Sequence, residues 1–226
     1  MSTKSISIII PVYNEASTIK QLMDNLEYFR DKSEIIFVDG GSSDNTKSII
    51  EKRYRVVVSP KKGRASQMNY GASLSGGDIL FFLHADSHLS PDALERIHEV
   101  MEKGYKAGCF KIKFDSRSII MKICGFMSNL RVRLRNIAFG DQGIFIDRKY
   151  FYGLGGYREI PLMEDYQLSM DIKADGEKIA LARAKIITSE RRFVKNGRLR
   201  TMARMQRLQY MYRKGEDIEK IASLYK

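Results

Sequence analysis

The sequence has 226 residues, a length typical of one large domain or of one domain with an extension. Apolar residues make up 43% and charged residues 29%, a balance that excludes disordered, collagen-like and disulfide-stapled proteins. The 39 Lys and Arg outnumber the 27 Asp and Glu, which gives a net charge of +12. This excess predicts an anionic partner such as nucleotide phosphates, nucleic acid or an acidic membrane surface.

The N-terminal residues and the cysteines predict a cytoplasmic protein. The apolar run at 6–10 is cut short by Pro11 and lacks the length and cleavage site of a signal peptide. No segment reaches the roughly 18 to 20 apolar residues that span a bilayer. Cys109 and Cys124 have no CxxC spacing and no His cluster around them, which favours free thiols in a reducing compartment.

Alternating strand and helix patterns fill the first half of the chain. We expect strands at 6–12, 34–38, 55–59 and 79–83, with helices from 17, from 44 to about 53, at 64–75 and at 90–103. Four such units in succession predict an α/β fold with a mainly parallel sheet. In such sheets ligands bind beyond the carboxyl ends of strands, which is where the polar motifs of this chain fall.

The second half of the chain has a different pattern. It predicts a helix at 164–175, an apolar and basic segment at 116–139, and strands at 107–114, 143–147 and 184–188. Between 183 and 214 there are eleven Lys or Arg and a single acid, Glu190. We therefore expect a domain at 1–197 and a basic helical extension at 198–226 that packs on it.

Polar residues stand at several predicted strand and helix ends. Asp39 leaves a strand beside two glycines and can accept hydrogen bonds from a base or ribose, although a capped turn uses the same residues. His84 and Asp86 follow the fourth strand, and Asp86 with phosphate oxygens suits Mg²⁺ or Mn²⁺. A lone His is more often a packed edge residue. Glu164 and Asp165 open a helix, either as dipole-favoured caps or as a general base.

Together these motifs resemble the family 2 glycosyltransferases over nearly the whole chain. The shared features, in order, are Pro-Val-Tyr-Asn-Glu at 11–15, Asp39, Gly-x-Ala-x-Gln-Met-Asn at 63–69, the Asp-Ser strand end at 86–87 and the Glu-Asp pair at 164–165. The chain also shows a narrower resemblance, to the radical-SAM/selenodomain-associated transferases, in segments 84–86, 140–143, 161–165 and 189–192.

The resemblance implies a GT-A fold with helices around the sheet. It also implies transfer, with inversion, of a sugar from a nucleotide-diphosphate donor, namely a UDP-sugar. Asp39 would bind the base. The whole nucleotide-binding set would be Pro11, Tyr13, Glu15, Asp39, Gly41, Arg64, Gln67, Ala85 and Asp86.

The same resemblance assigns the reacting groups. Asp86 would hold a divalent Mn²⁺ or Mg²⁺, and His84 would either ligate that ion or orient Asp86. Asp165 matches the catalytic base, and Glu164 would support it. The acceptor or phosphate side would contain Asp141, Gln142, Arg191 and Arg192.

Two departures from the family pattern refine this expectation. His84 stands where many members have Asp, which favours a softer ion because imidazole suits transition metals better than Mg²⁺. The processive Gln-x-x-Arg-Trp motif is missing, since the chain has no Trp. We therefore expect a single transfer to a hydroxyl acceptor and no polymer synthesis.

The basic C-terminal segment has two interpretations. Between 198 and 213 an apolar set recurs at near-helical spacing beside an arginine stripe: Leu199, Met202, Met205, Leu208 and Tyr212, with Arg200, Arg204 and Arg207. This helix, like segment 119–135, could lie on an anionic leaflet and favour a lipid-linked acceptor. Alternatively, its apolar face packs on the catalytic domain and the arginines face water.

Rival functions use parts of the same pattern. A nucleotidyltransferase also needs a metal and a nucleotide pocket, but a Gly-rich triphosphate signature is missing near the N-terminus. A catalytically degenerate nucleotide-binding protein would keep the pocket alone. Nucleic acid is not expected as a partner, because carboxylates at three strand or helix ends would repel a polyanion.

Overall fold

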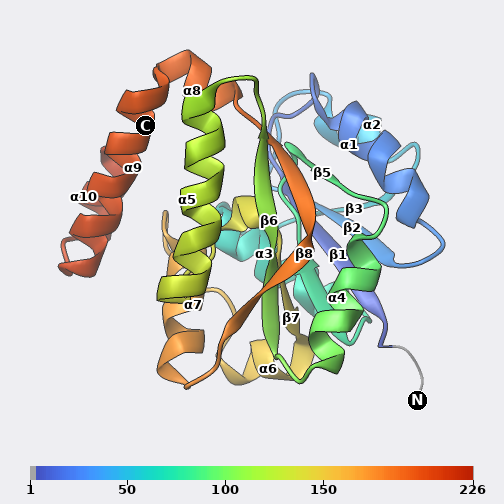
Figure 1. Cartoon of the computed structure of the whole chain (residues 1–226). Helices are drawn as coiled ribbons and strands as arrows, with labels where there is room; N and C mark the ends of the chain where they lie inside the picture. Colours follow the sequence, from blue (N-terminus) through green and yellow to red (C-terminus); the bar gives the residue numbers. More distant parts are fainter. Residues whose placement is uncertain (1–3, 226) are drawn as a thin grey trace.

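One sheet organises the molecule. The computed structural model describes residues 4–225, except for the side chain of Arg192. The strands are β1 Ile6–Val12, β2 Glu34–Asp39, β3 Arg55–Val58, β4 Ile79–Phe82, β5 Ser87–Leu89, β6 Ala107–Asp115, β7 Ile144–Asp147 and β8 Ile179–Ser189. Within the described residues they form one sheet in the order β3-β2-β1-β4-β7-β6-β8-β5 (Figure 1).

The predicted α/β fold with a mainly parallel sheet is confirmed. Strands β3, β2, β1 and β4 pair in parallel, and Val12 lies opposite Asp39, so the carboxyl ends of β1 and β2 are side by side. The other half of the sheet is mixed, because β7 runs antiparallel to both β4 and β6 while β6 and β8 are parallel. Strand β5, which pairs antiparallel with β8, was not predicted.

The last strand is longer than expected. The sequence predicts 184–188, whereas β8 begins at Ile179. Residues 179–182 read Ile-Ala-Leu-Ala, a composition that favours helix locally, and pairing with β6 overrides that preference. A register shift between Phe110 and Lys111 separates this early part of the pairing from the later part.

Helices cover both faces of the sheet. One face packs on α1 Ile19–Leu26, α2 Thr46–Ile50 and α4 Ala93–Glu102. The other packs on α3 Arg64–Leu74, α6 Arg148–Gly153 and α7 Glu164–Ala174. Because β1 is buried along its whole length, it carries the nearly continuous apolar run that a strand covered on both faces needs.

Helix α5, Ile119–Arg135, runs alongside β6 (Figure 1). Its inner face carries Met121, Gly125 and Val132, and Asn129 joins it to β6 through two hydrogen bonds with the backbone of Ile112. The opposite face of α5 is exposed. Over the described residues, no helix combines the length and apolar character required to cross a bilayer.

The chain ends in three helices, α8 Arg191–Asn196, α9 Arg198–Arg213 and α10 Ile218–Ser223. Leu208, Met211 and Ile221 form a small apolar cluster with Tyr166 at the start of α7. The predicted apolar face of α9 is partly wrong, since Leu199 is 66% exposed. The division of the chain at residue 197 stays a prediction.

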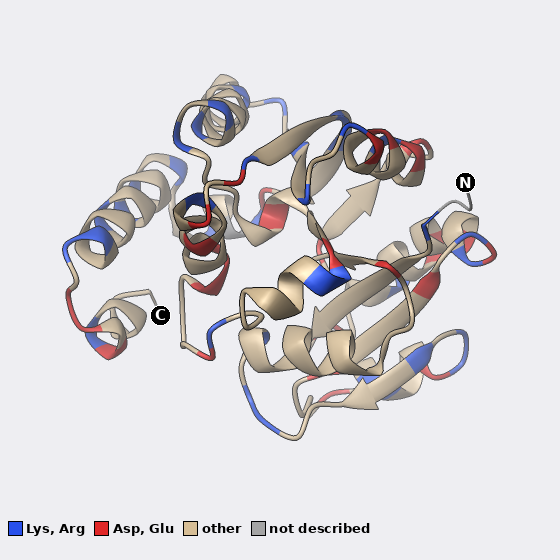
Figure 2. Ribbon diagram, turned by 90° about the horizontal axis from the view of Figure 1, so that it is seen from below, with Lys and Arg blue, Asp and Glu red and all other residues tan. Residues whose placement is uncertain are grey.

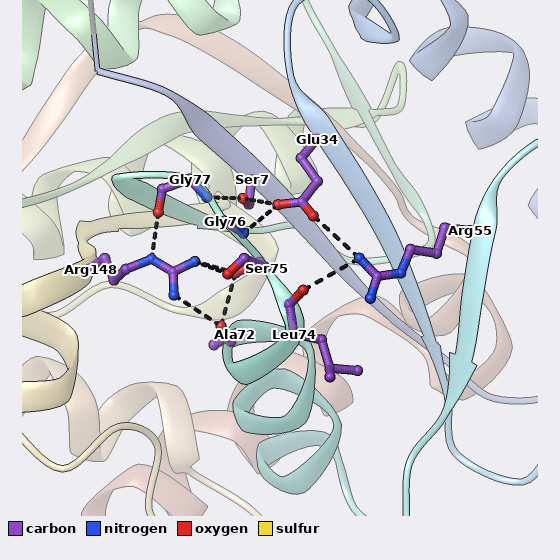
Figure 3. A network of polar contacts seen from close by, with 9 residues as sticks. All are labelled: Ser7, Glu34, Arg55, Ala72, Leu74, Ser75, Gly76, Gly77 and Arg148. Atoms are coloured by element: carbon purple, nitrogen blue, oxygen red, sulfur yellow. Dashed lines mark hydrogen bonds and ion pairs between the residues drawn. The ribbon is translucent and has the colours of Figure 1, made fainter.

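A polar network braces the edge of the sheet where the parallel strands begin (Figure 3). The Arg148 guanidinium donates to the carbonyl oxygens of Ala72 and Gly77, just where α3 ends and leaves such groups unpaired. Glu34 accepts from the Ser7 hydroxyl at 2.6 Å and from the Gly76 amide at 2.7 Å. The network thereby fixes the C-terminal end of α3 against β1 and β2.

Candidate active site

A cavity of about 570 Å³, which we call the strand-end cavity, opens beyond the carboxyl ends of the parallel strands. The amide of Leu83, the first residue after β4, donates to the carbonyl of Ile9, so the segment that follows β4 begins beside β1. Most of the predicted nucleotide-binding residues line this cavity: Pro11, Tyr13, Glu15, Arg64, Gln67, Ala85 and Asp86.

Asp39 and Gly41 shape the loop beside this cavity. One carboxylate oxygen of Asp39 accepts the amide hydrogens of Gly41 and Ser42, each at 2.9 Å, and the side chain is 2% exposed. Gly41 has a φ of +85°, a conformation that glycine adopts without strain. Asp39 therefore forms the capped turn that the sequence allowed as an alternative.

Gln67 ties two strand ends together from below the cavity. Its side-chain amide donates to the carbonyls of Val12 and Val38, at 2.9 and 2.7 Å. A β-carbon on Gly40 would lie 3.0 Å from the Gln67 side chain, which explains the need for glycine at that position. The side-chain NH₂ group of Gln67 thus holds the two strand ends that border the cavity.

The beginnings of α3 and α7 face each other across the site. Arg64 Nη1 lies 3.2 Å from Glu164 Oε1, and Glu164 is 3% exposed. Met163, directly before this helix, has a φ of +68°. Backbone strain of this kind in a non-glycine residue is most often found at functional sites.

Asp165 is held with its carboxylate between two backbone amides. Its two oxygens accept from Gly140 and from Tyr166, each at 2.7 Å. Burial, and then the neighbouring Glu164 carboxylate, raise the pKa of Asp165 above that of an ordinary aspartate, against the opposing effects of these amides and of Arg64. A buried carboxylate with a raised pKa is a better proton acceptor than an exposed one.

His84 and Asp86 lie between the two helix starts. Burial, reinforced by the charge of Arg64, lowers the pKa of His84 to about 3, so its imidazole is neutral and able to bind a metal. Burial raises the pKa of Asp86, and the Glu15 carboxylate raises it further. Gly140 packs so closely on His84 that a β-carbon there would collide with the imidazole.

A second hollow of about 190 Å³, the inner cavity, shares Arg64, His84 and Asp86 with the strand-end cavity. Asp165 lies in its wall. The remaining lining comes largely from the second half of the chain, including Phe114, Phe139, Asp141, Phe193, Thr201 and Met205. Two cavities that meet at the same three side chains can hold two reactants side by side.

The residues predicted for the acceptor or phosphate side separate in the structure. Asp141 lines the inner cavity, whereas Gln142 is fully buried and accepts a hydrogen bond from Arg131 at 2.8 Å. Arg191 lies 3.5 Å from Glu15 at the mouth of the strand-end cavity. The side chain of Arg192 lies outside the described residues.

Sequence reasoning missed the contribution of α8 and α9 to the inner cavity. Phe193, Thr201 and Met205 belong to helices whose sequence predicts only an amphipathic basic segment. The guanidinium of Arg131 stacks 4.1 Å from the centre of the Phe139 ring. The sequence predicted only an apolar and basic segment around this residue. The pattern of charged and apolar residues does not predict contacts between residues that lie far apart in the chain.

Asp141 offers a test of the electrostatics. Burial raises its pKa from 3.8 to about 6, with Arg131 opposing and Asp86 reinforcing the shift. The folded state therefore binds a proton more tightly than the unfolded state, and stability falls as the pH rises from about 4 to about 6. We expect Asp141→Asn to increase the free energy of unfolding by about 3 kcal/mol at neutral pH. Urea unfolding at neutral pH and at about pH 4 measures this, and an equal gain at both would contradict the charge-based explanation.

The sequence profile of glycosyl transferase family 2 matches residues 7–152. The chain belongs to glycosyl transferase family 2. The match includes the strand-end cavity and His84, Asp86 and Asp141, and it ends before Asp165. The narrower resemblance to the radical-SAM/selenodomain-associated branch stays a prediction.

One curated relative is similar to this chain over part of its length. The undecaprenyl-phosphate 4-deoxy-4-formamido-L-arabinose transferase of Yersinia pestis is 28% identical over 156 residues, which cover 63% of this chain and 48% of that protein. The chain thus spans about half the length of this relative.

The mannosyltransferase PcManGT of Pyrobaculum calidifontis, in complex with GDP-Man and Mn²⁺, has a TM-score of 0.71 at 19% identity, covering 93% of this chain and 62% of its own. TarS 1-349 of S. aureus, in complex with UDP-GlcNAc, has a TM-score of 0.66 at 17% identity, covering 82% and 58%. These likenesses confirm the expected GT-A fold.

Proposed function

We propose that this family 2 member is an inverting, non-processive glycosyltransferase that moves a sugar from a UDP-sugar to a hydroxyl acceptor. The observation that carries the proposal is the junction of the strand-end and inner cavities at Arg64, His84 and Asp86. The strand-end cavity would hold the donor, as the nucleotide sugars named with the two solved structures suggest. The inner cavity, with Asp165 in its wall, would hold the acceptor.

The donor set fits a divalent ion whose coordination the substrate completes. The part of the chain that the structure describes presents no group of three or more His, Cys, Asp and Glu placed to hold a metal. Asp86 and His84, which line both cavities where these meet, would be the protein ligands. Mg²⁺ and related ions are commonly held by one or two carboxylates together with substrate phosphates. When bound, Mn²⁺ or Mg²⁺ would neutralise negative charge on the diphosphate.

The chain's own residues account for the remaining chemistry. Asp165 would take the proton from the acceptor hydroxyl, whose oxygen attacks the anomeric carbon from the face opposite the leaving diphosphate. The new bond joins that carbon to the acceptor oxygen, and the broken bond joined it to the phosphate oxygen. Arg64 and Arg191, which lie near Asp86, would face the developing negative charge.

We also propose a lipid-linked acceptor and contact with a membrane surface. The undecaprenyl-phosphate relatives support a lipid-linked acceptor, and the basic helices support contact with an anionic leaflet. Helix α9, which precedes α10, carries its positive charge as arginines (Figure 2). The proposed location is the cytoplasm, peripheral to the inner face of the membrane.

We expect transfer to decline as the pH is lowered, and to do so at a higher pH than an ordinary aspartate would give. The ionised carboxylate is the active form of Asp165, and its raised pKa means that it is protonated earlier as acid is added. The pH profile of kcat at saturating substrate measures this. Glu164→Gln removes the like charge and should move the acidic limb to lower pH; an unmoved limb would assign it to another group.

A thermal-shift titration tests the proposed function directly. UDP, GDP, CDP and ADP are each added with Mn²⁺ or with EDTA. A ligand at about 100 times its dissociation constant stabilises the folded state by about 2.7 kcal/mol, so metal-dependent stabilisation by UDP is the expected result. Silence across all four nucleotides would overturn the transferase proposal. The corresponding nucleoside triphosphates are titrated in the same way, and stabilisation by these alone would favour a nucleotidyltransferase.

A further inference from the structure

A groove of about 230 Å³ runs between α5 and α9, which lie side by side in Figure 1. We call it the α5–α9 groove. Apolar side chains make up most of its lining, among them Met127, Leu130, Leu134, Phe193, Met202 and Met205. Asn129 and Gly125 turn one side of α5 toward β6. The groove lies along the neighbouring flank of α5, where Phe114 of β6 also lines it.

The groove is continuous with the inner cavity. Phe114, Phe139, Asp141, Phe193 and Met205 line both spaces. A molecule whose reacting group lies beside Asp165 could therefore extend an apolar portion between α5 and α9.

The Thr201 hydroxyl is an independent sign that the inner cavity binds a polar group. This residue lines the cavity and is 3% exposed, and its hydroxyl has no hydrogen-bond partner among the described residues. A buried hydroxyl without a partner costs about 1–3 kcal/mol, and a polar group of a bound acceptor would supply the partner.

The outer surface of α5 continues the apolar path beyond the groove. Ile119, Ile123, Phe126 and Leu134 are between 53% and 73% exposed, and their spacing places them in one stripe along the helix. Large apolar side chains exposed together mark an interaction site. There is no Asp or Glu from 116 to 140 or within α9, whereas both helices are rich in arginine. A stripe of this kind flanked by positive charge is complementary to an anionic lipid surface.

We propose that the α5–α9 groove binds the isoprenoid chain of the lipid that carries the acceptor, with its polar head in the inner cavity. This inference rests on the proposed transferase function for the identity of the head. Apolar cavities of about 150 Å³ already accept a benzene molecule, so the groove has room for the first units of the chain. The rest of the chain follows the exposed stripe of α5 into the membrane.

Calorimetric titration with farnesyl phosphate, kept below its micelle-forming concentration, tests the groove. Met127→Gln and Met202→Gln place a polar amide of similar size in the groove, and Met127 is already 54% exposed, so the fold should tolerate the change. We expect each variant to bind farnesyl phosphate about tenfold more weakly, since the polar amide loses the apolar contact that the methionine side chain gives the bound chain. Met170→Gln, at a 38% exposed position of α7, is the matched control and should bind like the wild type.

UDP titrations of the same variants separate this inference from the proposed function. Loss of farnesyl phosphate binding with unchanged UDP binding supports the groove. Equal farnesyl phosphate binding in all variants, or binding of inorganic phosphate with the same affinity, would overturn it. A wild-type protein that binds farnesyl phosphate in the groove but no nucleotide would reject the transferase proposal while supporting the lipid site. If sedimentation instead shows a dimer that Met127→Gln dissociates, with farnesyl phosphate binding unchanged, a second copy covers the groove and the inference fails.

Discussion

Asp165→Asn is expected to abolish sugar transfer and to leave nucleotide binding close to that of the wild type. An amide cannot accept the acceptor's proton, and loss of a general base commonly costs about two to four orders of magnitude in rate. Asp165 lies in the inner cavity but not in the strand-end cavity. Steady-state transfer and UDP titration, measured on the same preparation, give the two quantities.

The Asn variant needs a check on folding. In the wild type both carboxylate oxygens accept backbone amide hydrogens, and the side-chain NH₂ of Asn would face one of those donors. This mismatch costs about 1–3 kcal/mol and opposes the stability that is gained when a buried charge with a raised pKa is removed, so the free energy of unfolding has to be measured. Asp175→Asn, at the exposed end of the same helix, is the control. If Asp165→Asn loses UDP affinity in proportion to its loss of rate, Asp165 is not the base.

Asp86→Ala has the second large expected effect, which falls on binding. Asp86 faces the strand-end cavity with its pKa raised by burial, a setting in which a carboxylate gains from a bound cation. Removal of this ligand should weaken Mn²⁺-dependent UDP binding by about 100-fold or more, since even residues behind a metal ligand cost 10–100-fold when changed. Titrations with UDP in Mn²⁺ and in EDTA measure the metal-dependent part.

The comparison in EDTA is decisive for Asp86. Without metal, the variant and the wild type should bind UDP with similar affinity, or the variant more tightly, because a carboxylate near the diphosphate has been removed. Asp31→Ala, an exposed change far from the cavities, should behave like the wild type throughout. Metal-dependent binding that survives in Asp86→Ala would move the metal site elsewhere.

The sequence predicted the parallel half of the sheet well because its signals are local. The β-branched run of β1 and the apolar face of α1 are typical of a buried strand and an amphipathic helix. It failed at 179–183, where alanines favour helix and only the partner strand decides, and at β5, which is too short to leave a pattern. Such elements depend on tertiary pairing.

The candidate site was predictable where a motif lies at a strand end. Asp86 and Arg64 line the strand-end cavity as their positions suggested. The hydrogen bonds of Asp39 and Gln67 involve backbone groups of the loop and strand ends beside the cavity. The sequence could not predict this, because it depends on three-dimensional geometry. Thr201 could not be predicted, since it comes from a helix that meets the site only after the chain has folded.

The polar network around Arg148 links a position far from the cavity to the residues that line it. Helix α3 has eleven residues, a rod of about 16 Å, with the brace at one end and Arg64 and Gln67 at the other. Movement of the braced end would be carried along the rod to the cavity, because a helix transmits displacement without bending much. A mutational survey that ranks positions by distance from substrate would pass over Arg148, although its loss would register as a defect in turnover.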